Sequence, residues 1–240
     1  MNRALFAAAT GMAAQQRNLD IVADNLANAD VVGFKSAAAS FTPLGAGPGF
    51  GTVLSAEHHV FSQGKLERTG GPFDVAIDGV GFFSVERDGE RAYTRAGSFS
   101  RGADGRLRNA DGWTLRGVRI PSSALEVSVA ADGRVSVGSS GGARAPAGRI
   151  ALVAFAAPEH LRPLGTALFA ATQGSGPPRE LAPGGDRGPK IVFGSLEKSN
   201  VSIVESMMAI LAAQRAYEAN AKGVQAGDEM LRIANNLHRS

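Results

Sequence analysis

Apolar residues recur at every seventh position near the C-terminal end of the sequence. The stretch from Ser199 to Leu237 contains no proline, which leaves a helix uninterrupted. The repeat consists of Ile203, Ile210, Tyr217, Val224 and Leu231. A seven-residue apolar spacing places a narrow stripe along one side of a helix, and such a stripe is the contact surface of a coiled coil. Ser202 and Glu205 have the spacing of a capping box, and Asn200 is an alternative N-cap. The pattern predicts a long helix from about residue 201 to residue 237.

The N-terminal residues carry the same spacing. The repeat there consists of Leu5, Met12, Leu19 and Leu26, and it ends before Gly33 and Phe34. We therefore expect a first helix over residues 1–30. If the two helices packed only on each other, part of each stripe would stay in water, although burying a leucine or isoleucine contributes about 1.5–3 kcal/mol. The stripes predict association with other copies of the chain, and head-to-tail association that does not close gives a helical filament.

The residues between the helices have a different pattern. Glycine is abundant, with 31 residues in the chain, and Asp-Gly pairs separate short runs of alternating apolar residues. The pairs are Asp78-Gly79, Asp88-Gly89, Asp104-Gly105, Asp111-Gly112 and Asp132-Gly133. Asp-Gly between β-prone runs favours hairpins, because glycine accepts a positive φ. The runs predict strands at Phe73–Ile77, Gly81–Glu86, Arg91–Arg95, Gly105–Arg108, Trp113–Ile120, Leu125–Ala130, Gly133–Val137, Arg149–Ala156 and Ala167–Ala171.

The fold class expected is mixed α and β, with long terminal α-helices forming a coiled-coil domain around a central all-β domain. The β domain is expected to be an antiparallel sandwich or to resemble a barrel. Gly/Pro-rich loops are expected at residues 139–148 and 173–189. We expect four parts: an N-terminal coiled-coil helix over residues 1–30, an extended connector over 31–70, the β domain over 71–193 and a C-terminal coiled-coil helix over 194–240.

Several function classes lack support in the sequence. The chain has no cysteine. His58 and His59 are adjacent, so on a strand their side chains point to opposite faces, and His160 and His238 have no acidic or histidine partners at ligand spacing. We therefore expect no metal site and no cofactor. A net charge of +3 without a basic run gives no reason to expect nucleic-acid binding. No stretch approaches the roughly 20 apolar residues of a membrane span. The apolar repeat continues past Gln15, so we expect the N-terminus not to be a cleaved secretory signal.

One short match to a catalytic motif occurs. Ser195 and Lys198 fit the Ser-x-x-Lys pattern of penicillin-binding enzymes, but the accompanying Ser-Asp-Asn and Lys-Thr-Gly elements are missing. A four-residue match is weak, and a turn between a strand and a helix is the better explanation of these residues. We therefore expect a protein that is not an enzyme, and an assembly subunit is the class that the residues favour.

Longer motifs resemble a known family. The stretch from Thr10 to Asn28, followed by Val32-Gly-Phe-Lys35, resembles the N-terminal signature of bacterial flagellar rod and hook proteins. Central motifs at 62–66, 74–83 and 93–99 resemble the same family, as do C-terminal motifs at 194–201 and 214–218. The positions carried over from these motifs are Asn25, Leu26, Asn28, Gly33, Phe34, Asn200, Arg215 and Tyr217. The resemblance covers nearly the whole chain in the family's order.

This resemblance implies a structural subunit of the flagellar basal-body rod. Such proteins polymerise into a helical tube, the drive shaft that carries torque from the motor to the hook. The implied partners are other copies of the chain, other rod subunits, hook or hook-proximal subunits, the flagellar type III export apparatus and the surrounding P and L rings. The implied location is the rod in the periplasmic space, reached by export without a cleaved signal peptide.

Alternatives stay open at this stage. The N-terminal motif and Gln214 to Glu218 resemble the distal rod protein, whereas the short connector and the chain length resemble the proximal rod protein, which we slightly prefer. A hook-type subunit of the same axial family is a further alternative. Outside the family, a periplasmic binding module would show a defined pocket, and an enzyme centred on Ser195 would react with a β-lactam probe.

Overall fold

The computed structural model describes residues 3–45, 50–139, 144–185 and 188–237, and these form two compact units. The first unit comprises residues 1–27, 37–58 and 201–240, and the second comprises residues 28–36 and 59–200. The chain therefore passes from one unit to the other after residues 27, 36, 58 and 200. Residues 31–70, the expected connector, contribute to both units.

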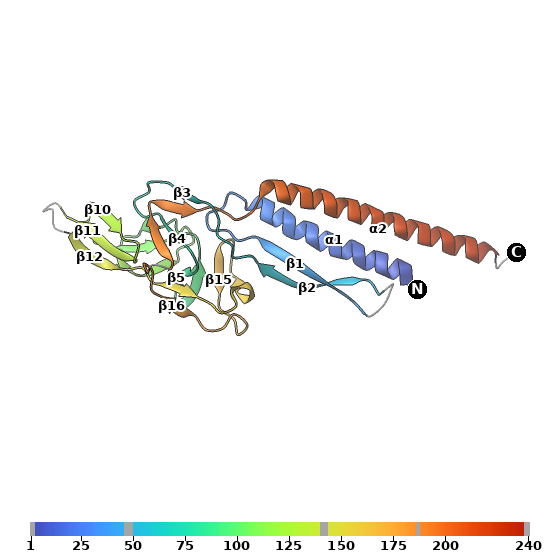
Figure 1. Cartoon of the computed structure of the whole chain (residues 1–240), viewed down its shortest axis with the longest axis horizontal. Coiled ribbons are helices and arrows are strands. Elements are labelled where there is room, and N and C mark those ends of the chain that lie inside the picture. Colours follow the sequence, from blue (N-terminus) through green and yellow to red (C-terminus); the bar gives the residue numbers. More distant parts are fainter. Residues whose placement is uncertain (1–2, 46–49, 140–143, 186–187, 238–240) are drawn as a thin grey trace. The chain divides into compact units, whose positions relative to one another are not determined.

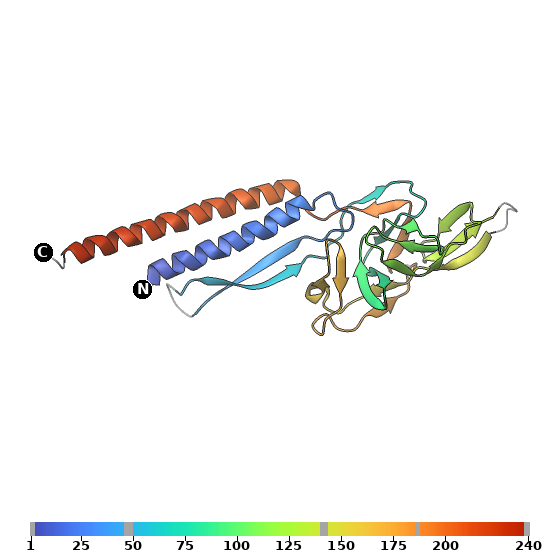
Figure 2. The same cartoon turned by 180° about the vertical axis from the view of Figure 1, so that it is seen from behind.

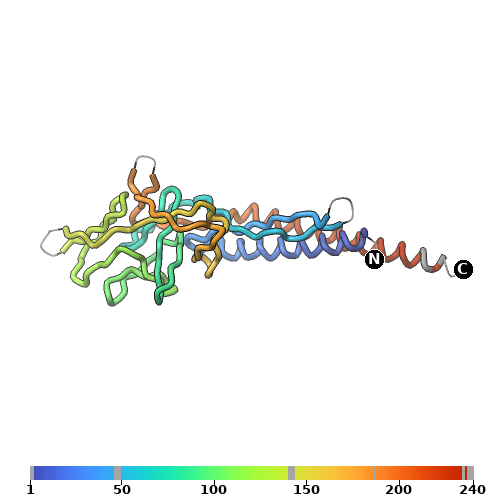
Figure 3. The backbone as a smooth tube through the Cα atoms, turned by 90° about the horizontal axis from the view of Figure 1, so that it is seen from below, coloured from blue at the N-terminus to red at the C-terminus, as the bar shows by residue number. Residues whose placement is uncertain are grey.

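The first unit contains the two terminal helices and a hairpin. The helices are α1 (Arg3–Ala27) and α2 (Ile203–Leu237), and the hairpin pairs β1 (Ala37–Pro43) with β2 (Thr52–His59). The helices run antiparallel along each other, as the opposite views of Figure 1 and Figure 2 show. Since α2 has 35 residues and α1 has 25, α2 continues past the first residue of α1 (Figure 3).

The cap of α2 is the one that the Ser-x-x-Glu spacing predicts. The backbone N–H of Glu205 donates to Oγ of Ser202 over 3.3 Å, which satisfies one of the unpaired donors in the first helical turn. The alternative cap, Asn200, has another role. Its side chain bonds to backbone groups of the second unit, so it does not cap the helix.

The glycine- and proline-rich stretch after Lys35 is more ordered than expected. Within the expected extended connector, residues 37–43 and 52–59 pair as the β1–β2 hairpin, and residues 46–49 lie outside the described ranges. Two side chains of α1 fix this hairpin, and neither contact is visible in local composition. Extended backbone was expected here, and these long-range contacts to α1 explain why the pairing of β1 with β2 was not.

The second unit is an antiparallel β domain. Its main sheet runs in the order β10-β11-β12-β9-β5-β6-β15-β14, with β7, β8, β13 and β16 attached beside this path. The strands are β3 (Leu66–Arg68), β4 (Val75–Asp78), β5 (Phe82–Arg87), β6 (Glu90–Thr94), β7 (Ser100–Arg101), β8 (Arg106–Arg108), β9 (Thr114–Arg119), β10 (Glu126–Val129), β11 (Arg134–Gly138), β12 (Arg144–Arg149), β13 (Leu152–Ala154), β14 (Arg162–Pro163), β15 (Leu168–Ala170), β16 (Arg179–Leu181), β17 (Lys190–Phe193) and β18 (Ser195–Glu197). A short 3₁₀ helix, η1, spans Pro158–His160. Each of the nine predicted strands overlaps one of these, and the expected fold class is confirmed.

The Asp-Gly pairs act as expected at most positions. Asp88 and Gly89 have φ values of 53° and 85°, the two positive angles that a type I′ turn needs, and they join β5 to β6. Asp78-Gly79 is different, because β4 pairs with β17 rather than with β5. That pair therefore links two strands that are not neighbours.

Both predicted loops contain strands. Residues 144–149 form β12, which pairs with β11 through a register shift between Val135 and Ser136. Residues 179–181 form β16, which pairs with β13. These stretches contain glycine and proline but become strands because a partner strand lies next to each of them in space. Composition alone does not reveal such partners.

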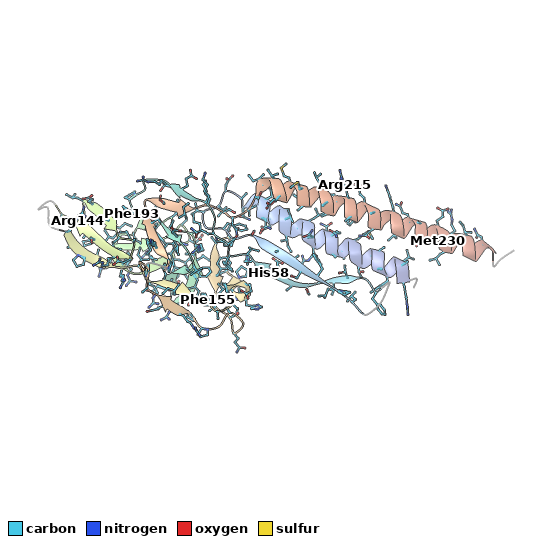
Figure 4. All side chains as sticks on the ribbon, in the orientation of Figure 1. His58, Arg144, Phe155, Phe193, Arg215 and Met230 are labelled. Carbon is cyan, nitrogen blue, oxygen red and sulfur yellow. The ribbon has the colours of Figure 1, made fainter. Side chains whose placement is uncertain are left out.

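The core of the second unit lies within the main sheet and against β4 and β17. Its largest fully buried apolar side chains are Phe83, Ile77, Leu115, Ile120, Ile150 and Leu152, and the single tryptophan, Trp113, belongs to the same cluster. A second cluster is aromatic and contains Phe82, Tyr93 and Phe169, packed with Phe61 and Phe155. Phe155 and Phe193 are labelled in Figure 4.

Candidate functional site

The face of α2 that packs on α1 consists of small residues. Ser206, Ala213 and Gly227 are buried there. Together with Asn220 they form a seven-residue repeat. A Cβ built on Gly227 would lie only 2.8 Å from Cδ2 of Leu5, and one on Gly11 would lie 3.0 Å from Nδ2 of Asn220. The small residues therefore let the two helices approach closely.

The residues of the two predicted apolar repeats, which we call the seam residues, occupy other positions. On α1 the four repeat residues Leu5, Met12, Leu19 and Leu26 are half-buried. On α2, Ile210 and Val224 are half-buried, whereas Ile203, Tyr217 and Leu231 are exposed. The buried repeat of α2 thus begins three residues after Ile203, at Ser206. The larger apolar repeat is left only partly covered within the chain.

The opposite side of α2 is apolar and uncovered. We call it the outer face, and it consists of Ile203, Val204, Met207, Met208 and Leu211. At 100° per residue these five side chains occupy about 140° of the helix circumference. Each of these side chains is at least 49% exposed. Burying such apolar side chains in a contact with another protein would be energetically favourable. An apolar strip of this kind on a helix is typical of an association surface.

The C-terminal end of α2 forms a second apolar surface. We call it the overhang, and it consists of Met230, Leu231 and Ile233, all exposed. Leu5, near the start of α1, already lies against Gly227, and in the described part of α1 only Arg3 and Ala4 precede it. Figure 4 labels Met230 on this end of α2 and Arg215 further back along it. Within the described ranges, the side chains of Arg215 and Tyr217 have no hydrogen-bond or ion-pair partner. These motif residues therefore do not stabilise the fold through polar side-chain contacts.

The hairpin is fastened to α1 at two points. The side-chain amide of Asn25 donates to the carbonyl of Ala37 over 2.8 Å and accepts its N–H over 2.7 Å, as a neighbouring strand would. Near the other end, Oγ1 of Thr10 accepts the N–H of Thr52 over 3.2 Å. Asn25 is buried, so its amide replaces hydrogen bonds that water cannot supply. This contact gives the motif residue Asn25 a structural role.

Three charged side chains are buried together in the second unit, and we call them the triad. Nζ of Lys35 lies 2.7 Å from Oε1 of Glu197, and Nε of Arg95 forms an ion pair with Oε2 over 3.0 Å. Side-chain exposure is 0% for Lys35 and Glu197 and 4% for Arg95. Burial lowers the pKa of Lys35 and of Arg95, and the charge of Glu197 opposes both shifts.

Segments from both ends of the sequence meet at the triad. Lys35 also donates to the carbonyl of Ser62, and Gly64 donates its N–H to Oε1 of Glu197. The N–H of Gly33 donates to the carbonyl of Glu197 over 2.8 Å. Gly33 has a φ of 70°, and a Cβ there would lie 2.3 Å from the backbone N of Ala96, so glycine is required.

The other motif residues of this region lie beside the triad. The amide of Asn200 accepts the N–H of Ser36 over 2.8 Å and donates to the carbonyl of Val60 over 2.7 Å. Phe34 is buried, and the carbonyl of Asn28 accepts the N–H of Val31. Sequence reasoning missed the triad itself, although each member stands as a charged residue inside one of the motifs. That position was the available signal.

The rival sites gain little from the structure. Ser195 is buried in β18, and Lys198 pairs with Glu67 over 3.5 Å. Among the described residues there is no cluster of histidine and acidic side chains that could hold a metal, and His238 lies outside the described ranges. Neither described helix has the length and apolar content that crossing a bilayer demands.

A cavity of about 380 Å³ lies in the second unit, and Phe61, Phe82 and Phe155 are part of its lining. Arg95 is a polar group on its wall, but its guanidinium already donates to the carbonyls of Gly79 and Gly81 and pairs with Glu197. A binding module would need polar groups that remain available to a ligand. This cavity therefore gives little support to that alternative.

Comparison with known proteins connects this geometry to a family. Residues 5–35 match the family described as flagella basal body rod protein, and residues 194–237 match the C-terminal region of the flagellar basal body rod FlgEFG proteins. Residues 76–137 match the D1 domain of the flagellar hook proteins FlgE/F/G. The flagellar basal-body rod protein FlgG of Borreliella burgdorferi is 38% identical over the full length of both chains. The chain belongs to the FlgG family of flagellar basal-body rod proteins.

Other relatives agree with this assignment. FlgG of Agrobacterium fabrum is 37% identical, with 97% of this chain and 98% of that protein covered, and FlgG of Bacillus subtilis is 31% identical over the full length of both. The Borreliella alignment spans 264 positions against 240 residues here, so that relative has about 24 residues without a counterpart. A short chain is thus compatible with the FlgG family. The preference for the proximal rod protein, which depended on the short connector and the chain length, loses its support.

Proposed function

We propose that this chain is a structural subunit of the flagellar rod that polymerises through the outer face and the overhang of α2. The observation that carries the proposal is the set of large apolar side chains on α2 that α1 leaves uncovered. Full-length similarity to FlgG rod proteins supports the same conclusion, because membership of a rod family implies polymerisation with rod subunits.

The two faces of α2 support this division of roles. The small-residue face holds α1, and the larger apolar residues on the other side can meet a neighbour without disturbing that packing. A rod requires the outer face of one copy to meet a different surface of the next copy, which is a heterologous contact. Heterologous contacts that do not close produce a helical polymer, which is the form that a rod requires.

The seam residues have different roles in the proposed assembly. Ile203, Tyr217 and Leu231 contact neighbouring copies, since they are exposed. Ile210, Val224 and the four repeat residues of α1 support the helix pair and complete their burial in the polymer. Arg215 stays exposed and unpaired in the described part of the chain, so it is available for a polar contact between subunits.

The finer partners and the route follow from the resemblance. We propose contacts with other rod subunits and with hook or hook-proximal subunits, and passage through the flagellar type III export apparatus without a cleaved signal. The surrounding P and L rings are further candidate partners, and the proposed location is the rod in the periplasmic space. A torque-carrying shaft is the role that these partners require.

Electron microscopy of the purified chain tests the proposal. We expect filaments or tubes once the concentration exceeds a threshold, and α-helical circular dichroism that increases as the ends of α2 become buried. A protein that sediments as a monomer at every concentration, with both helices intact, would contradict assembly through α2.

A further inference from the structure

The triad makes the closing of the second unit depend on the last part of the chain. Lys35 and Arg95 bring two positive charges into a site that is almost closed to water, and Glu197 supplies a negative charge to both. Burying a cation without a partner is strongly unfavourable. The two cations can therefore be buried together only when residue 197 has arrived.

Strand pairing adds a second dependence on the same segment. The partner of β4 is β17 and the partner of β3 is β18, so residues 190–197 complete both pairs. Val75, Ala76 and Ile77 of β4 are almost fully buried. Without β17 and β18, these core residues would lie on a strand whose edge is open to water.

Distance along the sequence makes this contact late. Lys35 and Glu197 are 162 positions apart, and closing so long a loop has an entropic cost that local contacts do not have. Arg95 carries the effect further, because it also donates to the carbonyls of Gly79 and Gly81 between β4 and β5. A missing Glu197 would thus disturb strands far from it in sequence.

We propose that the triad is a completion clasp: the β domain stays open until the segment Gly194–Asn200 docks and Glu197 joins Lys35 and Arg95. The N-terminal segment at residues 28–36 and the β strands then close in one step. A chain that becomes available from its N-terminus onward would remain unfolded in this unit until nearly all of it is present.

Glu197→Gln in the full-length protein tests the clasp, with Glu67→Gln as the matched control. Glu67 pairs with Lys198 on the exposed side of the β3–β18 pair, so the control removes a carboxylate from the same strands without touching the buried site. Urea unfolding is followed by the fluorescence of Trp113, which is buried in the core. We expect Glu197→Gln to raise the ratio of unfolded to folded protein by about two to three and a half orders of magnitude, and Glu67→Gln by less than about fivefold.

A double variant separates charge from packing. If two unmatched cations cause the loss, Lys35→Met in the Glu197→Gln protein removes one of them and restores at least about tenfold of the folded population. If Glu197 only fills space, Lys35→Met makes the protein less stable still. That second result, or a Glu197→Gln protein as stable as the control, would overturn the proposal.

Hydrogen exchange shows how far the effect reaches. In Glu197→Gln, or in the double variant where the single variant does not fold, we expect faster exchange of amides in β4, β5 and β9 together. Faster exchange confined to β3 and β18 would show a local role for Glu197 and contradict the clasp.

Discussion

Leu211→Asp separates assembly from folding, because Leu211 belongs to the outer face and 55% of its surface is exposed. Full burial of a leucine contributes about 1.5–3 kcal/mol, so contact with a neighbour can still add roughly half of that, about 1 kcal/mol or more. An aspartate buried in the contact without a partner costs about another 1–3 kcal/mol. The total of at least about 2 kcal/mol weakens each subunit contact by at least about 30-fold.

The monomer should tolerate this change. An exposed aspartate in a helix interior costs only about 0.7 kcal/mol relative to the best helix formers. Circular dichroism and the emission of Trp113 report the helices and the β domain separately. Pelleting and electron microscopy measure the concentration above which polymer forms, and we expect that concentration to rise at least about 30-fold.

Leu125→Asp is the matched control for this experiment. Leu125 is 76% exposed and lies in the β domain just before β10, so the chemical change is identical but leaves α2 untouched. We expect this variant to assemble as the parent does. Assembly of Leu211→Asp at the parent's concentration, or equal loss in both variants, would refute the assignment of the outer face.

Three further changes test individual contacts. Gly227→Leu should force α1 and α2 apart and lower the melting temperature of the helices, measured by circular dichroism. Gly223→Leu is the control and should not lower it, because no atom lies within 4 Å of a Cβ at Gly223. Equal effects of the two variants would contradict the close approach of the helices. Asn25→Ala should leave the backbone N–H and carbonyl of Ala37 unpaired and destabilise the hairpin by about 1–3 kcal/mol. We expect faster exchange of the backbone amides in β1. Unchanged exchange would show that Asn25 does not hold the hairpin. Burial raises the pKa of Tyr93 above 10.0, so as the pH rises the tyrosine loses its proton in the unfolded chain first, and the stability that it contributes is lost above about pH 10. Tyr93→Phe should therefore lose less stability than the parent between pH 9 and 11. Identical pH profiles of stability for the two proteins would contradict this.

The predictable parts of the fold are those with a local signal. The helices follow from proline-free stretches and apolar spacing, and Ser202 caps α2 as its spacing predicts. The strands follow from alternation and from turns such as Asp88-Gly89. In each case the residues that determine the structure are close together in sequence.

The missed parts depend on residues far apart in sequence. The β1–β2 hairpin needs Asn25 and Thr10 of α1, and β12 needs β11. The triad joins residues from three separate motifs, so no single window contains it. On α2, the repeat of large apolar residues was visible in the sequence. The repeat of small residues that is buried, which includes Ser206 and Ala213, was not, because its burial depends on how closely α1 approaches.

The chain passes between its two compact units four times, after residues 27, 36, 58 and 200. Where two units are joined by a single backbone connection, one break in it releases both halves. Here a cut at any one crossing leaves three intact covalent bridges. A load that passes between the two units of this rod subunit is therefore divided among four backbone crossings.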